Sequence, residues 1–231
     1  MRIDARKGII VAASLVIVVY ALYTSLGPIA VYLFSKANGI SVSYKSLRVR
    51  NGNFSFRGLA AADKRTGIGI YSDEAEIKPI YRLDRLHDMG VDFCLSKVNF
   101  IKEGSGRRIG YDSLEELLAV PFESNWSYRE IRGLVYFRKD DIHIDSFSAK
   151  SDEITLEVAG DINGTEISDL YIKIRFSAAV TDRIPQELSK AILEEEPDGW
   201  RSLSVRLSGN LASPSISISS KLFRLNIKTV N

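Results

Sequence analysis

The pattern of apolar and polar residues changes once along the chain, close to residue 35. Residues 8–26 (GIIVAASLVIVVYALYTSL) contain no charged side chain, and the uncharged run continues through GPIAVYLF to Phe34. From Ile40 onward, apolar and polar residues alternate, beginning with ISVSYK. A long apolar run is typical of a membrane helix, whereas alternation with a period of two is typical of strands that have one apolar face.

The uncharged run is long enough for a membrane-spanning helix, which needs about 20 apolar residues. A cleaved signal peptide is the alternative, but its apolar region covers only about 7–15 residues and ends at a small-residue cleavage site. Arg2, Arg6 and Lys7 precede the run, and basic residues are retained on the cytoplasmic side. We therefore expect a cytoplasmic stub and single-pass membrane anchor over residues 1–34, with a non-cytoplasmic body over residues 35–231.

The body is predicted to consist mainly of strands joined by short turns. Asn51-Gly52 separates two alternating segments, and Asn-Gly accepts the positive φ of a type I′ hairpin turn. A second Asn-Gly turn is expected within Asp161–Gly164. Short turns favour antiparallel neighbours over parallel strands joined by helices. Further strands are predicted at residues 91–101, 133–138, 142–149, 154–162, 170–178, 203–209, 215–220 and 222–228.

Two segments have helical spacing instead. The first begins at Ser113, a capping residue with Glu116 three positions later, and ends at Pro121. The second covers residues 184–197 (IPQELSKAILEEEP). The sequence therefore predicts a mainly β protein: an N-terminal transmembrane helix, then a curved antiparallel sheet, groove-like or sandwich, with one or two short helices.

Composition supports a folded body but indicates no charged partner. The chain has 231 residues, of which 45% are hydrophobic and 26% charged, so it can bury a core. The first seven residues hold three basic and one acidic side chain, which leaves 31 − 3 = 28 basic and 29 − 1 = 28 acidic side chains in the remainder. A neutral body gives no electrostatic reason to bind nucleic acid. The single cysteine, Cys94, excludes an internal disulfide.

No motif in the chain indicates catalysis. His87 and His143 are far apart and belong to no metal-binding spacing. The glycine-rich segment GSGRRIG at residues 104–110 lacks the Gly-Lys-Ser/Thr of a phosphate loop. We expect no catalytic, metal-binding or cofactor-binding residues and no cofactor, and hence a protein that is not an enzyme.

The order of several segments resembles the AsmA-like superfamily of bacterial envelope proteins, which includes TamB-like relatives. Near the start of the body these segments are SLRVRNGNFSFRGLAAADKRTG, SDEAEIKPIYRL and VDFCLSKVNFI; near its end they are DSFSAKSDEITLEVAGDI, IPQELSK and LSVRLSGNLASPSISI. Together they touch most of residues 40–231, although well-known members are several times longer. The resemblance implies a sheet bent into a groove whose apolar face holds acyl chains, and a role in moving lipid between the inner and outer membranes.

On this hypothesis, alternating apolar residues of the predicted strands face lipid, and phospholipid acyl chains are the ligand. The candidates are Ile142, Ile144, Leu156, Val158, Ile172, Ile174, Leu203, Val205 and Leu207. The same face could instead pack on itself as a closed core. The alternative function is a structural or accessory subunit of an envelope or secretion complex, comparable to the type II secretion N component, with other envelope proteins as partners.

Overall fold

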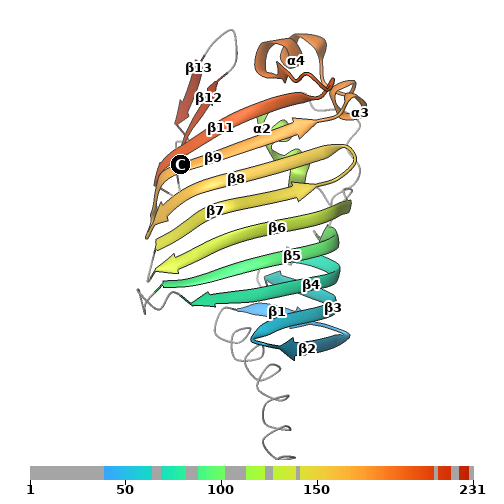
Figure 1. Ribbon diagram of the computed structural model, residues 1–231. Coiled ribbons are helices and arrows are strands. Elements are labelled where there is room, and N and C mark those ends of the chain that lie inside the picture. The colour runs from blue at the N-terminus through green and yellow to red at the C-terminus, as the bar shows by residue number, and fades with distance from the viewer. Residues whose placement is uncertain are drawn as a thin grey trace, which may run out of the picture.

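The described strands form one large antiparallel sheet, as the computed structural model shows (Figure 1). The structure describes residues 39–63, 69–81, 88–101, 113–122, 127–138, 141–210, 213–219 and 224–228. The anchor predicted over residues 1–34 lies outside these ranges. Within them, no helix is both long enough and apolar enough to cross a membrane.

The strands follow one another across the sheet as a meander, which confirms the predicted antiparallel arrangement. From β3 to β9 each strand pairs with the next one in sequence, and β11, β12 and β13 continue beyond β9. The short strands β1 and β2 both pair with β3, and β10 pairs with β11. The strands are β1 Ile40–Ser43, β2 Ser46–Arg50, β3 Asn53–Asp63, β4 Gly69–Tyr81, β5 Asp88–Ile101, β6 Ser127–Arg138, β7 Asp141–Lys150, β8 Ile154–Asn163, β9 Glu166–Phe176, β10 Glu194–Glu195, β11 Arg201–Asn210, β12 Ser215–Ser219 and β13 Arg224–Lys228.

Both Asn-Gly sequences form turns, but in different ways. Asn51 and Gly52 have φ values of 51° and 78°, so both central residues are left-handed, as a type I′ turn requires. At the second site Asn163 is the last residue of β8, and the two-residue loop consists of Gly164 and Thr165. Gly164 has a φ of 58°, which places the glycine first in the loop, as in type II′ turns.

Short helices gather at one end of the strands. They are α2 Leu114–Ala119, η1 Val120–Phe122, α3 Ala178–Thr181 and α4 Gln186–Ile192. The predicted cap of α2 is confirmed, because the backbone N–H of Glu116 donates to Ser113 Oγ at 3.2 Å. In Figure 1, α2 lies behind the sheet, while α3 and α4 lie beside the ends of β9 and β11.

Two predicted segments end earlier than expected. The helix predicted over residues 184–197 ends at Ile192, because Leu193 is extended and Glu194–Glu195 pairs with β11 as β10. The strand predicted over residues 170–178 ends at Phe176, and Ala178 begins α3. In the first case pairing with β11 overrides the local helical pattern, as tertiary context commonly does.

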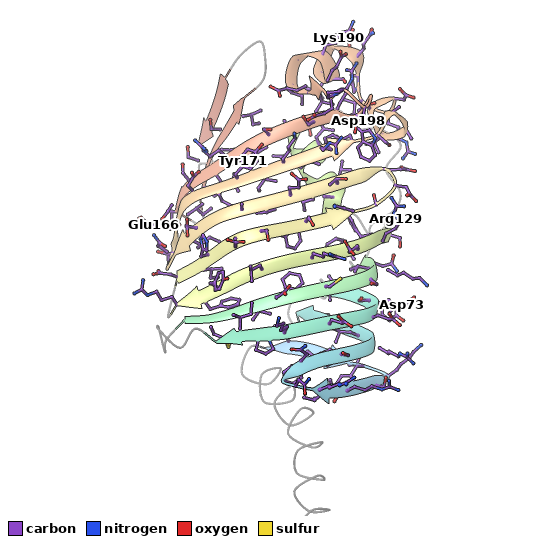
Figure 2. The ribbon with its side chains drawn as sticks, viewed as in Figure 1. Asp73, Arg129, Glu166, Tyr171, Lys190 and Asp198 are labelled. Atoms are coloured by element: carbon purple, nitrogen blue, oxygen red, sulfur yellow. The ribbon has the colours of Figure 1, made fainter. Side chains whose placement is uncertain are left out.

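The sheet has an apolar face, here called the inner face, and a polar outer face, which is turned toward the viewer in Figures 1 and 2. Side chains alternate between the two faces along each strand. The inner face supplies most of the hydrophobic core, and Leu117, Val120, Val180 and Ile192 of the helical segments pack into the same cluster. The described strands therefore do not form a two-sheet sandwich; helices cover part of one sheet.

Candidate apolar binding surface

The strand register aligns the inner-face side chains into rows that run across the sheet. A row near the helical end of the strands is called the covered row here. Its members are Phe56, Ala75, Leu95, Ile131, Ala149, Leu156, Ile174 and Leu203. Each is at most 6% exposed, because the helical segments pack against this end of the inner face. The covered row is thus part of a closed core.

A second row lies at the opposite end of the same strands and is called the open row here. It consists of Met89, Phe137, Ile142, Ile162 and Ile167. Met89 is 43% exposed and Phe137 is 38% exposed, and these two are direct cross-strand neighbours. Ile142 and Ile162 are half-buried, and only Ile167 is buried. The open row therefore leaves apolar surface accessible to solvent, mainly on β5 and β6.

Two intermediate rows connect the covered row to the open row. One contains Phe54, Ile77, Phe93, Gly133, Phe147, Val158, Ile172, Val205 and Ile218; the other contains Pro79, Val91, Val135, Ile144, Gly160, Leu170, Leu207 and Ile216. Apart from Val205, Ile218 and Leu170, their large side chains are half-buried rather than buried. The inner face is therefore continuous from a sealed core to an exposed end.

The nine residues predicted to face lipid all lie on this inner face, but in two environments. Leu156, Ile174, Leu203 and Val205 are at most 2% exposed, so the protein's own atoms enclose them as core side chains. Ile142, Ile144, Val158, Ile172 and Leu207 are half-buried. Contact with lipid stays a prediction for these five, which lie in the open and intermediate rows.

Sequence reasoning did not select Met89 and Phe137, the two most exposed members of the inner face. Phe137 lies in the segment VYFRKD, where Val135 and Phe137 alternate with Tyr136 and Arg138. That alternation was the available signal, since Val135 and Phe137 share a face. Met89 continues the alternation of Val91, Phe93 and Leu95, but it lies before residue 91, where the predicted strand begins.

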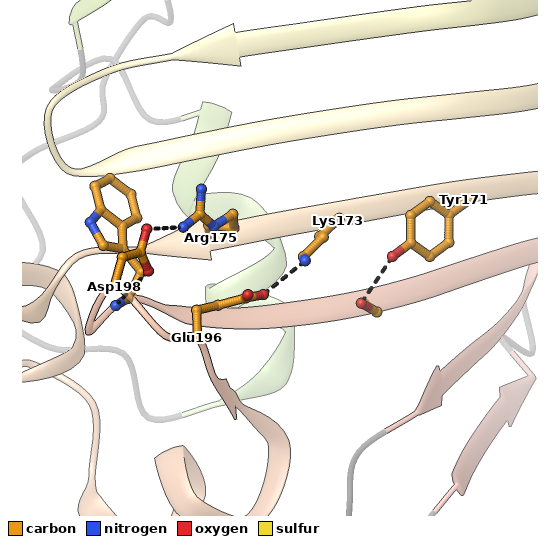
Figure 3. A network of polar contacts seen from close by, with 7 residues as sticks. Tyr171, Lys173, Arg175, Glu196 and Asp198 are labelled. Carbon is orange, nitrogen blue, oxygen red and sulfur yellow. Dashed lines mark hydrogen bonds and ion pairs between the residues drawn. The ribbon is translucent and has the colours of Figure 1, made fainter.

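The outer face carries a network of ion pairs beside the helical end (Figure 3). Lys173 Nζ lies 2.8 Å from Glu196 Oε1, and Arg175 pairs with Asp198. The Arg175 guanidinium also stacks 5.3 Å from the centroid of the Trp200 ring. These contacts hold the segment between β10 and β11 against the surface of β9.

The charges in this network neutralise one another. The hydrogen bond from Lys173 lowers the pKa of Glu196, and the hydrogen bond from Arg175 lowers the pKa of Asp198. A carboxylate held ionised by a paired cation is a poor proton acceptor at neutral pH. The network therefore fits a structural role, in which it holds the segment between β10 and β11 against β9, better than a role in acid–base catalysis.

His143 belongs to a second polar group on the outer face. Its Nδ1 lies 2.7 Å from Asp161 Oδ1, and its ring stacks on Tyr136 with centroids 6.1 Å apart. The side chains of His143 and Asp161 are both half exposed to solvent. Within the described ranges, no three His, Cys, Asp or Glu side chains are grouped so as to hold a metal ion. His87 and residues 104–110 lie outside those ranges.

Family models, curated proteins and solved structures contain no match for this chain. Its role therefore has to be inferred from the inner and outer faces themselves.

Proposed function

We propose that this chain is an inner-membrane-anchored envelope protein whose inner face takes up lipid acyl chains and helps to move lipid between the inner and outer membranes. The observation that carries the proposal is the open row, where Met89 and Phe137 expose a continuous apolar face to solvent. Exposed apolar residues are unremarkable when isolated, but contiguous apolar surface marks a binding region. The anchor over residues 1–34, the periplasmic body and the AsmA-like relationship belong to the same proposal.

The dimensions of the open row suit an acyl chain. The row crosses five strands from β5 to β9, and neighbouring strands lie about 4.8 Å apart, so the row is about 19 Å long. The hydrocarbon of one leaflet is about 15 Å thick, half of a core of about 30 Å. A chain from one leaflet could therefore lie across the strands of the open row with its whole length in contact with apolar side chains. No catalytic step is required.

Lipid content after purification tests the proposal. The full-length protein is extracted in a mild detergent and its bound lipids are measured by native mass spectrometry. Phe137→Asp is expected to remove most bound lipid while preserving the fold, because a side chain that is 38% exposed lets the carboxylate reach water. Tyr171→Asp is the matched control, since Tyr171 is 40% exposed on the outer face and hydrogen bonds to Ser204.

The control decides how the result is interpreted. Loss of lipid in the Phe137 variant alone supports the proposal, whereas equal loss in both variants indicates lipid held by the anchor or by the detergent micelle. A folded wild-type protein that carries no lipid above that background contradicts it. Co-purification of one stoichiometric protein, lost in the Phe137 variant, would instead favour the accessory-subunit alternative.

A further inference from the structure

The first strands of the body are unusually basic. Residues 39–62 contain Lys45, Arg48, Arg50 and Arg57 but no acidic residue, although the whole chain has almost equal numbers of basic and acidic side chains. Strand β2 (SLRVR) alternates strictly, so that its arginines share one face and its apolar residues share the other. The basic residues are therefore concentrated at one edge of the sheet rather than spread over it.

The register places these cations on the outer face. Arg48 pairs across the strands with Ser55 and is exposed, as is Arg50, which pairs with Asn53. A Cβ at Gly58 would lie 2.9 Å from side-chain carbons of Lys45, so the aliphatic part of this lysine packs against the Gly58 position, next to Arg57 in sequence. We call Lys45, Arg48, Arg50 and Arg57 the basic edge.

The basic edge is poorly neutralised by the protein itself. Among the described residues, no carboxylate lies within ion-pair distance of Lys45, Arg48 or Arg50. Arg57 is 4.0 Å from Glu74, and both side chains are 66% exposed. Such an exposed, long pair contributes little. The edge is therefore free to attract an external anion.

The chain length limits how far this edge can lie from the predicted anchor. Only residues 35–39 separate the end of the uncharged run at Phe34 from the start of β1 at Ile40. Six Cα–Cα steps span at most about 22 Å even when fully extended. If residues 8–34 occupy the membrane, β1 and β2 begin close to its surface.

We propose that the basic edge docks on the anionic phospholipid headgroups of the membrane that holds the anchor. The inference rests on the proposed function, because it requires the anchor. Arginine suits this role because its guanidinium recognises phosphate oxygens with two parallel hydrogen bonds. Cations near an anionic membrane surface each strengthen binding by about fivefold, an effect that falls off within a Debye length.

Docking at this edge has a consequence for the inner face. Leu47 and Val49 of β2 point to the face opposite the arginines, and they pair with Phe56 and Phe54, the first members of the covered row and of one intermediate row. Headgroup contact on one side of β2 would therefore place the start of the apolar face at the membrane surface. This strand is where an acyl chain would pass from bilayer to protein.

Hydrogen–deuterium exchange of the full-length protein in nanodiscs tests the docking. The expected result is slower exchange of the β2 and β3 amides in phosphatidylcholine nanodiscs with 30% phosphatidylglycerol than in phosphatidylcholine alone. Arg48→Gln/Arg50→Gln should weaken docking by about 25-fold, at about fivefold per cation, and abolish the difference. Arg129→Gln/Lys190→Gln removes the same net charge from exposed positions on β6 and α4, away from β2 (Figure 2), and should preserve it.

Two results would overturn the docking proposal: equal exchange in both kinds of nanodisc, or equal loss of protection in both double variants, which would indicate an effect of net charge alone. A urea unfolding midpoint unchanged from wild type excludes misfolding of either variant. Native mass spectrometry of the same samples reports acyl-chain binding separately. Lipid bound to the inner face without protection of β2 would disprove the docking and leave the proposed function intact.

Discussion

Ile174 and Ile142 offer a matched test of how the burial of apolar side chains on the inner face changes along the strands. Both are isoleucines on central strands and both face inward, but Ile174 lies in the covered row at 1% exposure, whereas Ile142 is half-buried in the open row. Ile174→Ala should leave a cavity between Leu156 and Leu203 and cost about 2–5 kcal/mol. Ile142→Ala should cost about 1–2 kcal/mol, because only part of its side chain leaves water on folding and no sealed cavity remains.

Urea unfolding of the full-length protein in detergent, followed by circular dichroism, measures both values. For a domain of this size about 1 kcal/mol corresponds to about 2–4 °C in Tm, so Ile174→Ala should lower Tm by about 4–20 °C. The change in strand propensity is the same in the two variants and cancels in the comparison. Equal destabilisation, or a larger loss for Ile142→Ala, would show that the open row is as closed as the covered row and would refute the reasoning.

Three further predictions concern local interactions. Tyr128→Phe should cost about 1–3 kcal/mol in urea unfolding, because the buried hydroxyl donates to the carbonyl of Pro121 at 2.6 Å and the carbonyl would lose its partner. Glu196→Gln should lower the free energy of unfolding at neutral pH, because pairing with Lys173 lowers the pKa of Glu196 in the folded state. The difference in free energy of unfolding between wild type and variant should be largest above about pH 5 and should disappear as the pH falls through that lowered pKa. Gly52→Ala should cost about 1–2 kcal/mol by strain alone, because its φ is 78° and no atom lies within 4 Å of the added Cβ.

Local sequence was enough to predict the strands, their antiparallel order and the common face of the nine apolar candidates. Alternation determines which side chains share a face, and Asn51-Gly52 determines a turn with two positive φ values. Both signals are contained within a few neighbouring residues, and neither depends on distant parts of the chain.

The sequence did not reveal which part of the apolar face is covered. Leu203 and Ile142 have equivalent alternating surroundings, yet Leu203 is 0% exposed and Ile142 is half-buried. The difference arises because side chains of the helical segments, such as Leu117 and Ile192, belong to the same buried cluster as Leu203, whereas Ile142 lies outside that cluster. Likewise Glu194–Glu195 reads as the continuation of a helix and becomes β10 only because β11 offers it a pairing edge. Such long-range contacts are not encoded in local periodicity.

Photo-crosslinking in cells tests most directly whether lipid contacts the inner face of the sheet. A benzophenone side chain is placed at Phe137 on the inner face or at Tyr171 on the outer face, two aromatic positions that are 38% and 40% exposed. Irradiation should attach lipid at position 137 and give no adduct above background at position 171, since the register puts them on opposite faces. Equal capture at both positions, or capture at neither in a folded protein, would contradict an inner face that carries lipid.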